Sequence, residues 1–385
     1  MTFEKLVMEE ALDAIIDYRG RTPQKSPIGI STLSAKSVKN GQIDYSECYY
    51  ISPEEYKKFM TRGFPQKGDI LLTTEAPLGM VAKLDRADVA VAQRLLTLRG
   101  KKGVLDNDFL MYYLQSSEGQ GLLKAKETGT TVTGIKQAEF RKIVIKVPDF
   151  QTQKKIAAIL SALDEKIAIN RAINDNLQQQ ASALFSSLYD RSNTEVRFTD
   201  LIQILGGGTP KTGENTYWNG NIAFFTPKDV GTPYTLITEK TITEEGLSHC
   251  NSRLYPENTV FVTARGTVGK VGMSGVPMAM NQSCYALVGK ETHQLLVYFY
   301  TLKAVDRLKH KASGAVFDAI TTRDFESEQI MKLSDDDAKA FLRVAAPMFQ
   351  EVLNNNIENL RLSTLRDSLL PKLMSGEIDV SAVQL

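Results

Sequence analysis

An internal duplication is the feature that most constrains how this chain of 385 residues can fold. The motif Gly20-Arg21-Thr22-Pro23 recurs as Gly207-Gly208-Thr209-Pro210, and residues 68–79 recur as residues 258–269. The offset between matching residues stays between 185 and 190 along the copies, and the order of the motifs never changes. Solenoid proteins stack three or more short repeats, so two copies this long do not make a solenoid. The chain is therefore predicted to contain two similar domains.

Each copy is followed by a long segment with the pattern of an amphipathic helix. Residues 151–189 contain neither Gly nor Pro, and their apolar residues recur three and four positions apart. A second stripe begins near Ser334, whose hydroxyl and three following aspartates suit a helix N-terminus. Pro347 is expected to kink or split this second helix, and Pro371 and Gly376 are expected to mark its end.

These patterns predict an α+β protein in which two long antiparallel helices join two similar mixed α/β domains, with pseudo-two-fold symmetry. The predicted segments are a first domain over 1–150, a helix over 151–190, a second domain over 191–333 and a helix over 334–385. Inside the first domain we expect a helix over 12–18, strands over 70–74, 90–98 and 143–147, and one helix over 109–123. Asp149 is expected to cap the first long helix.

A polar residue interrupts both helical stripes at the same place. If Ile156 and Leu163 are a positions of a heptad pattern, Asn170 is also an a position, and Asn356 lies at the matching place in the second helix. A buried Asn at an a position lowers stability but fixes register and partner orientation. A solvated face rich in Asn, at residues 354–356, explains the same residues equally well. Both interpretations remain open.

The sequence holds no recognisable catalytic or metal-binding motif. Its three histidines lack suitably spaced carboxylates or thiolates, and neither H-E-x-x-H nor paired C-x-x-C occurs. Residues 266–270 resemble a phosphate-binding loop, but their spacing is wrong, so residues 266–270 and 76–80 are predicted as turns between strands. No Asn-Pro-Pro-aromatic motif of amino-methyltransferases appears. We therefore predict a binding or assembly protein without catalytic residues, metal or cofactor of its own.

Composition restricts the setting in which such a protein works. Three widely spaced cysteines suit a reducing compartment, and no apolar run approaches the roughly 18 residues of a membrane span. The sequence thus predicts a soluble, cytoplasmic protein that does not involve a membrane. The net charge is only +1, so any surface that binds nucleic acid must be locally basic.

Short clusters of basic and hydroxyl-bearing residues occur at matching points of the two copies. Such groups suit phosphate contacts, whereas Arg94 and Gln282 carry the guanidinium and amide groups that read base edges. Ordinary solvated charge is the alternative explanation for any one of them, but their matching as a set favours a binding role. The candidate DNA-binding residues are Arg19, Arg21, Thr22, Lys25, Lys36, Lys39, Arg94, Thr130, Thr131, Thr209, Lys211, Lys228, Arg265, Gln282 and Lys309.

Several motifs spread over the whole chain match one known family. They are Gly20-Arg21-Thr22-Pro23 with its repeat, Lys67-Gly68-Asp69-Ile70-Leu71-Leu72, residues 264–269, Ala279-Met280-Asn281-Gln282, residues 148–188 and residues 365–376. With these motifs the chain resembles the specificity (S) subunit of a type I restriction–modification system. One departure is visible at residues 334–338, where Ser-Asp-Asp-Asp-Ala replaces the proline-led, Gln-rich helix start of the first copy.

The resemblance implies a division of labour. Two target-recognition domains each read half of an interrupted double-stranded DNA site, and the helices hold them apart and dock two methylase (M) subunits. Restriction (R) subunits complete the enzyme. S-adenosylmethionine, ATP and Mg²⁺ belong to these partners, so this chain itself is expected to be non-catalytic. The composition fits one alternative equally well, a two-fold protein scaffold that does not bind DNA.

Overall fold

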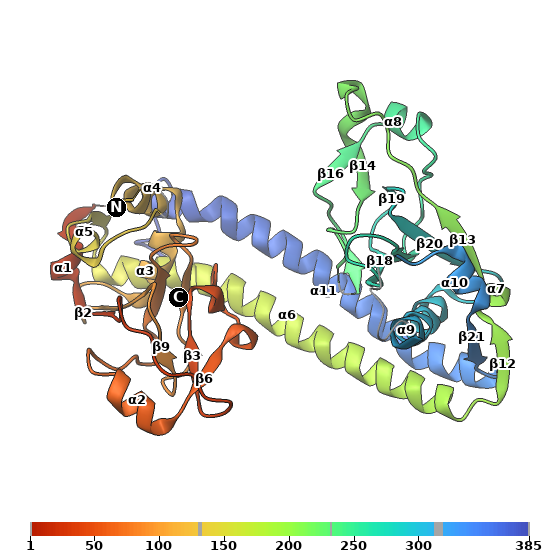
Figure 1. Cartoon of the computed structure of the whole chain (residues 1–385). Helices are drawn as coiled ribbons and strands as arrows, with labels where there is room; N and C mark the ends of the chain where they lie inside the picture. Colours follow the sequence, from red (N-terminus) through yellow and green to blue (C-terminus); the bar gives the residue numbers. More distant parts are fainter. Residues whose placement is uncertain (1, 130–132, 232, 312–318, 384–385) are drawn as a thin grey trace. The chain divides into compact units, whose positions relative to one another are not determined.

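The computed structural model describes residues 2–129, 133–231, 233–311 and 319–383. The chain divides into two compact units (Figure 1). Unit 1 comprises Met1–Lys166 with Leu362–Leu385, and unit 2 comprises Ile167–Arg361. Each unit therefore contains one globular copy of the duplication together with part of each long helix. Among the described residues, no helix combines the length and apolar character needed to cross a membrane.

The main sheet of unit 1 has four antiparallel strands in the order β2-β10-β7-β8. Three smaller sheets accompany it, in the orders β6-β3-β9, β1-β11 and β4-β5. The strands are β1 (Glu4–Val7), β2 (Leu12–Asp17), β3 (Ile30–Leu33), β4 (Val38–Lys39), β5 (Gln42–Ile43), β6 (Tyr49–Ile51), β7 (Ile70–Thr73), β8 (Val81–Lys83), β9 (Ala90–Val91), β10 (Leu95–Gly100) and β11 (Val144–Val147). The helices are α1 (Met8–Ala11), α2 (Pro53–Phe59), α3 (Asn107–Gln115), α4 (Ser117–Ala125) and α5 (Gln137–Arg141), with 3-10 turns η1 (Ala35–Ser37) and η2 (Tyr45–Glu47).

Unit 2 repeats this plan. Its main sheet has the order β13-β20-β17-β18-β15, and smaller sheets have the orders β16-β14-β19 and β12-β21. The strands are β12 (Thr194–Arg197), β13 (Ile202–Gly206), β14 (Trp218–Phe225), β15 (Tyr234–Thr235), β16 (Lys240–Ile242), β17 (Val260–Thr263), β18 (Val271–Ser274), β19 (Met278–Met280), β20 (Cys284–Gly289) and β21 (Gln329–Lys332). The helices are α7 (Phe198–Leu201), α8 (Glu244–Ser248), α9 (Gln294–Lys311) and α10 (Thr322–Ser327), with the 3-10 turn η3 (Asn215–Tyr217).

Several predicted elements of unit 1 need correction. The helix expected over 12–18 is wrong, because these residues form strand β2, whose alternate residues Leu12 and Ile16 are buried beside β10. Spacing of four residues suits a strand as well as a helix, since residues an even number apart share one face of a strand. The predicted strand over 90–98 divides into β9 and β10, which belong to different sheets. The helix over 109–123 divides at Ser116, which caps α4 by accepting a hydrogen bond from the N–H of Gly119 at 3.2 Å. The strands expected over 70–74 and 143–147 are confirmed as β7 and β11.

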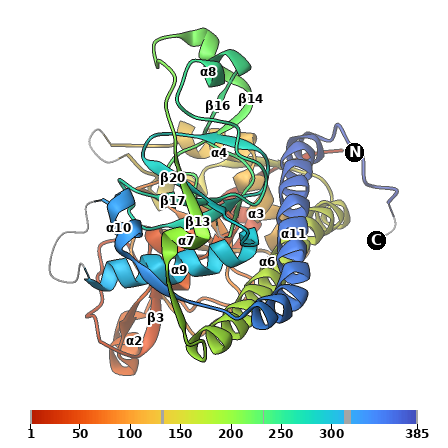
Figure 2. The same cartoon turned by 90° about the vertical axis from the view of Figure 1, so that its right-hand side faces the viewer.

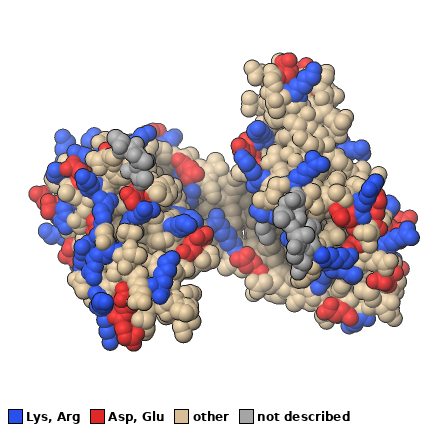
Figure 3. Space-filling view, viewed as in Figure 1, with Lys and Arg blue, Asp and Glu red and all other residues tan. Residues whose placement is uncertain are grey.

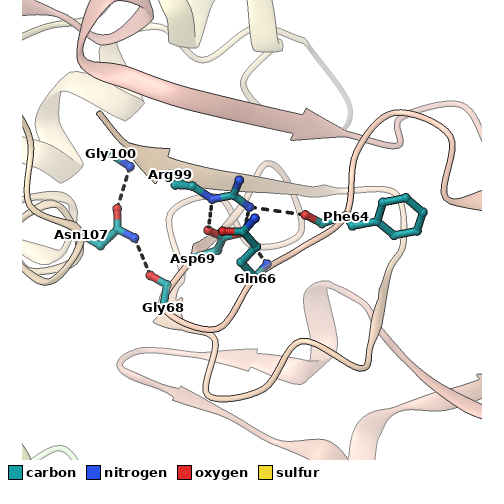
Figure 4. A network of polar contacts seen from close by, with 7 residues as sticks. All are labelled: Phe64, Gln66, Gly68, Asp69, Arg99, Gly100 and Asn107. Atoms are coloured by element: carbon teal, nitrogen blue, oxygen red, sulfur yellow. Dashed lines mark hydrogen bonds and ion pairs between the residues drawn. The ribbon is translucent and has the colours of Figure 1, made fainter. Parts of the chain in front are cut away.

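An ion pair with a buried carboxylate fixes the turn that leads into β7 (Figure 4). The guanidinium of Arg99 donates to both carboxylate oxygens of Asp69, at 2.7 and 2.8 Å, and the Gln66 N–H donates to the same carboxylate at 2.7 Å. Asn107, at the start of α3, bridges this turn to β10 by donating to the Gly68 carbonyl and accepting from the Gly100 N–H. Bidentate Arg–carboxylate pairs add geometric definition to a contact. The network therefore holds the start of β7 against the end of β10.

The two long helices are α6 (Phe150–Asp190) and α11 (Asp335–Ser375), each an uninterrupted run of 41 residues. Asp149 caps α6, since its carboxylate accepts the Thr152 N–H at 3.1 Å and the Thr152 hydroxyl at 2.6 Å. Ser334 caps α11 by accepting the Asp337 N–H at 3.1 Å. Both predicted caps are confirmed.

The split expected at Pro347 and the end expected at Pro371 are wrong. Both prolines lie inside α11 on its exposed side, where water can bond the carbonyl groups that they leave without an N–H partner. Gly376, with a φ of 78°, follows the last helical residue as expected.

Each unit builds its core around its share of these helices. In unit 1, Ile156, Leu160 and Leu373 join the core formed by α3 and the main sheet. In unit 2, α9 packs against both long helices (Figure 2). The ring of Phe299 lies 4.9 Å from that of Phe185 on α6 and 5.1 Å from that of Phe341 on α11. The long helices are thus integral parts of both cores.

Candidate nucleic-acid interface

Two loops with the same hydrogen bonds establish which residues correspond in the two units. In unit 1, the Thr73 hydroxyl donates to the Pro77 carbonyl at 2.6 Å and accepts the Met80 N–H at 2.9 Å. In unit 2, the Thr263 hydroxyl bonds the Thr267 carbonyl and accepts the Lys270 N–H at 2.9 Å. Both loops join consecutive antiparallel strands, β7 to β8 and β17 to β18, which confirms the turns predicted between strands. Met80 therefore corresponds to Lys270. Five residues earlier in each loop, Glu75 corresponds to Arg265.

The smaller sheets extend this correspondence. Strand β3 pairs in parallel with β9, and β14 pairs in parallel with β19 in the same way, so that Leu33 corresponds to Phe225. A turn follows each strand: the Ser34 N–H donates to the Ser37 hydroxyl at 3.2 Å, and the Thr226 N–H donates to the Asp229 carboxylate at 2.8 Å. Lys36 and Lys228 lie at the same position of these turns. The antiparallel partner of β3 is β6, and that of β14 is β16. The register of these pairs makes Tyr49 of β6 correspond to Lys240 of β16.

In unit 2 these segments enclose a cleft of about 530 Å³. We call it the basic cleft, because four of its lining residues are cationic: Lys228, Lys240, Arg265 and Lys270. Glu239 is the acidic residue of the lining, and its carboxylate lies 3.6 Å from the Lys228 ammonium. The Lys240 ammonium lies 5.6 Å from the centre of the Trp218 ring, a cation–π distance. Hydroxyl and amide groups of Thr226, Thr267, Asn281 and Ser283 complete the lining.

Most of the predicted unit 2 residues lie at or beside the basic cleft. Lys228 and Arg265 line it, and Gln282 lies between the lining residues Asn281 and Ser283. The Thr209 hydroxyl bonds the side-chain oxygen of Gln282, which ties the repeated Gly-Thr-Pro motif to this turn. Lys309 of α9 packs against Gly269 of the β17–β18 loop.

Lys211 is not among the residues that line the basic cleft. Its side chain is exposed, and its carbonyl accepts a hydrogen bond from the Trp218 indole.

In unit 1 the predicted residues are more dispersed. Arg19 and Glu75 line a smaller hollow of about 270 Å³. The Arg19 guanidinium donates to the Ile135 carbonyl at 2.8 Å. Glu75 also forms an ion pair with Arg94, whose Nε lies 2.7 Å from the carboxylate and whose φ of 73° places it in a left-handed turn. Arg94 is thus held by a carboxylate of its own unit.

The other candidate DNA-binding residues of unit 1 differ in their surroundings. Arg21 and Lys25 lie over aromatic rings, those of Phe59 at 5.3 Å and Tyr49 at 4.9 Å. Thr22, Lys36 and Lys39 have exposed side chains. Thr130 and Thr131 lie outside the described residues. Figure 3 shows basic side chains interspersed with acidic ones on the visible face of each unit.

The structure adds residues that the motif search did not select. Lys240 and Lys270 line the basic cleft. Lys240 belongs to no repeated motif, and Lys270 ends the turn over 266–270, whose counterpart over 76–80 has no Lys. Gln93 corresponds to Gln282, because the Ala92 N–H bonds the Leu33 carbonyl as the Asn281 N–H bonds that of Phe225. The counterpart of Arg94 is therefore Ser283, so Arg94 and Gln282 are neighbours in the repeat and not equivalents. The sequence signal for Gln93 is that a Gln occurs at this position in both copies of the duplication.

Side chains of the kinds that bind metals or act as nucleophiles also occur among the described residues. Within the described ranges, no group of three or more His, Cys, Asp or Glu side chains is placed to hold a metal ion. Burial raises the pKa of the Cys284 thiol to about 12, so it stays protonated near neutral pH and is a poor nucleophile. The interface offers charged and hydrogen-bonding groups for binding.

The long helices present a polar layer within unit 2. Asn170 is fully buried, so the solvated-face interpretation does not apply to it. Its amide donates to Glu358 at 2.7 Å and to Asn359 at 3.0 Å, whereas Asn356 is half-buried and accepts a hydrogen bond from Asn174 at 2.9 Å. The partner numbers fall along α11 as the numbers rise along α6, so the two segments are antiparallel in this unit. The polar layer is wider than the single pair of positions that the repeat suggested.

Comparison with known proteins identifies the family. The sequence model described as type I restriction modification DNA specificity domain matches residues 19–179 and again residues 191–332. The MjaIX specificity subunit of Methanocaldococcus jannaschii, named as part of a type I restriction enzyme, is 24% identical over 94% of this chain and 88% of its own length. The HindI specificity subunit of Haemophilus influenzae, named likewise, is 24% identical over 81% of this chain and 87% of its own length.

The fold agrees with a solved structure. The S subunit of a type I restriction–modification system from M. genitalium superposes with a TM-score of 0.64, at 15% identity, over 97% of this chain and 96% of that one. At this level of identity the likeness concerns the fold. Because the family model matches twice, over most of the chain, the protein belongs to the type I restriction–modification DNA specificity family and carries two copies of its defining domain.

Proposed function

We propose that this chain is the DNA-reading subunit of a type I restriction–modification complex and that each globular domain reads one half of a bipartite duplex target. The observation that supports this best is the repeated loop arrangement, in which corresponding loops come together in both units but carry different side chains. A backbone frame shared by the two units, with different polar groups on it, suits two readers of two different half-sites. Phosphate contacts would position each domain, and side chains at the turn of Gln93 or Gln282 would contact base edges.

The long helices would serve as spacer and docking surface. Apolar side chains remain exposed on them, among them Ile169 and Ile173 of α6 and Val344 of α11 in unit 2. Exposed apolar groups of this kind suit contact with partner proteins. We assign this surface to two methylase subunits, which restriction subunits would join to complete the enzyme.

In this arrangement the chain is non-catalytic. S-adenosylmethionine, ATP and Mg²⁺ act in the partner subunits, and the complex works in the cytoplasm. Support comes from the binding character of the groups at the interface.

A domain exchange tests the proposal. The full chain is co-expressed with its methylase subunit, and the methylated motif is read by sequencing host DNA. Replacing residues 191–333 with the same region of a relative should change one half of the motif and leave the other half as it was. A change in both halves would show that the domains do not read independently. Methylation or cleavage by the purified chain alone would contradict the non-catalytic assignment.

A protein scaffold without DNA contact is the competing function. The complex of this chain with its methylase should bind duplex DNA with a strong dependence on salt concentration. Absence of DNA binding by that complex would favour the scaffold.

A further inference from the structure

The two units differ in charge at the corresponding positions that surround the basic cleft. In unit 2 these positions are Lys228, Lys240, Arg265 and Lys270, all cations. Their counterparts in unit 1 are Lys36, Tyr49, Glu75 and Met80. One cation and one anion therefore occupy the places where unit 2 has four cations.

The position next to Glu75 and Arg265 differs between the units as well. In unit 1, Glu75 holds Arg94 in an ion pair of 2.7 Å, so a basic group near the same place is already partly neutralised. In unit 2, Arg94 is replaced by Ser283, and the position of Glu75 is taken by Arg265 itself. The change from Glu75 to Arg265 makes unit 2 more positive by two charges, whereas the change from Arg94 to Ser283 removes one, so these two positions are neutral together in unit 1 and carry one positive charge in unit 2. They lie on loops whose backbone hydrogen bonds are the same in the two units, so the difference is one of side chains on a shared frame.

The groups of the basic cleft match the chemistry of phosphodiester oxygens. Lysine and arginine side chains neutralise phosphates, and the Ser283 hydroxyl of the lining can donate to the same oxygens. Lys228 is 80% exposed, and Arg265 and Lys270 are exposed as well, so the cations can reach a backbone that lies along the opening. The cleft has one carboxylate in its lining, that of Glu239, and this carboxylate lies beside Lys228.

We propose that unit 2 holds the DNA backbone in the basic cleft through phosphate contacts, and that unit 1 makes few such contacts at the corresponding positions. This inference rests on the proposed DNA-reading function and adds that the two readers contribute unequally to affinity. The salt-dependent part of binding comes mainly from unit 2. Unit 1 contributes fewer cations at these positions, among them Lys36, Lys25 beside Tyr49 and the Arg94 that Glu75 orients.

Salt dependence gives a direct test, because each neutralised phosphate contributes about 0.9 to the slope of log K against log salt. Full-length chain with its methylase is titrated with a fluorescent duplex of unrelated sequence at several KCl concentrations. The double variant R265A/K270A should lower the slope by about 1.8. Between 50 and 200 mM salt the wild type should then lose about 12-fold more affinity than the variant. The same reduction should appear with the cognate target, and the methylated motif should stay the same.

Two matched variants complete the design. R197A/K332A removes two cations from the separate β12–β21 ribbon of unit 2 and should leave the slope unchanged. E75R/M80K introduces the unit 2 residues at the corresponding places in unit 1 and should steepen the slope. This second variant keeps the test valid even if R265A/K270A fails to fold.

Each outcome distinguishes the inference from the function on which it rests. If the wild type binds DNA but R265A/K270A has the wild-type slope, the phosphate assignment is wrong and the reading function stands. Loss of affinity for the cognate target alone, with an unchanged slope, would indicate base contacts and would also overturn the assignment. If the wild-type complex binds no DNA at any salt concentration, the proposed function itself fails.

Discussion

Replacement of Asn174 should reveal how much the polar layer contributes to the helix pair. The Asn174 side chain is 4% exposed and bridges three groups of α11 within unit 2. Its amide donates to the Asn356 side chain at 2.9 Å and to the Val352 carbonyl at 3.4 Å, and its oxygen accepts from Asn355 at 2.9 Å. The change to alanine removes the donor and the acceptor together but leaves their partners in place.

The expected cost follows from the burial of those partners. Asn355 is 6% exposed, so its amide would lose its acceptor in a site that water hardly reaches. A buried polar group without a partner costs about 1–3 kcal/mol. Asn356 is half-buried and can regain part of its hydration. Together these losses give about 2–4 kcal/mol for N174A.

Hydrogen exchange measures this cost where it arises. The free energy of opening is determined for peptides that cover α6 in unit 2, so no assumption of two-state unfolding of the whole chain is needed. N176A is the matched control, because Asn176 lies two positions along the same helix with an exposed side chain. Both variants gain the same helix propensity, so the difference between them isolates the buried contacts.

A difference below about 0.5 kcal/mol would refute this reasoning, since it would place the amide contacts within the range of surface substitutions. The variant N174L/N355L supplies a second check. It removes the buried pair of Asn174 and Asn355 from both helices and leaves the half-buried Asn356 to regain hydration, so its stability should equal or exceed that of the wild type while the register loses this polar constraint.

Three further predictions concern the spacer, the turn of unit 1 and the start of α6. Four residues inserted after Ala168 lengthen α6 by about one turn, or 5.4 Å. Because DNA rises about 3.4 Å per base pair, the unspecified gap in the methylated motif should widen by one or two base pairs. An active variant with the original gap would show that the helix does not set the spacing. Arg94→Ala should relax specificity in one half-site by about 1–3 kcal/mol, measured as methylation of mismatched targets, whereas an equal loss on all DNA would indicate a phosphate contact. Hydrogen bonds from the Thr152 hydroxyl and N–H lower the pKa of Asp149. The cap therefore stabilises the fold above the ordinary Asp pKa, near 3.9, and is lost as pH falls through the lower folded value. Asp149→Ala should cost about 1 kcal/mol at neutral pH, less below pH of about 4, and a cost that stays constant down to pH 2 would exclude the carboxylate as the cap.

Elements with strong local signals could be predicted from the sequence. The duplication, the two long helices and their caps at Asp149 and Ser334 follow from periodicity and from residue types that satisfy free N–H groups. Strands β7 and β11 follow from β-branched and apolar runs. The family resemblance rested on the same repeated motifs, and the match of the specificity-domain model to both halves confirms it.

Elements that depend on distant partners could not be predicted in this way. Residues 12–17 became a strand because β10 supplies the ladder of hydrogen bonds, and nothing within the segment itself distinguishes that outcome from a helix. Pro347 and Pro371 remained within α11 because they lie on its exposed side, and exposure is a property of packing.

The sequence by itself determined that there are two similar domains and two long helices. The repeated motifs and the helical spacing of apolar residues can be read within each segment, and both occur in each copy of the duplication. Tertiary structure alone decided which polar residues act together. Lys240 reaches the basic cleft beside Arg265 and Lys270 because a separate strand, β16, brings it there, and no spacing along the chain encodes that meeting. Glu75, which follows β7, pairs with Arg94, which directly precedes β10. Asn170 and Asn174 find their partners on α11 only when the helices pack. Charge and hydrogen bonding act over a few ångströms of space, so their partners are fixed by the fold and not by order along the chain.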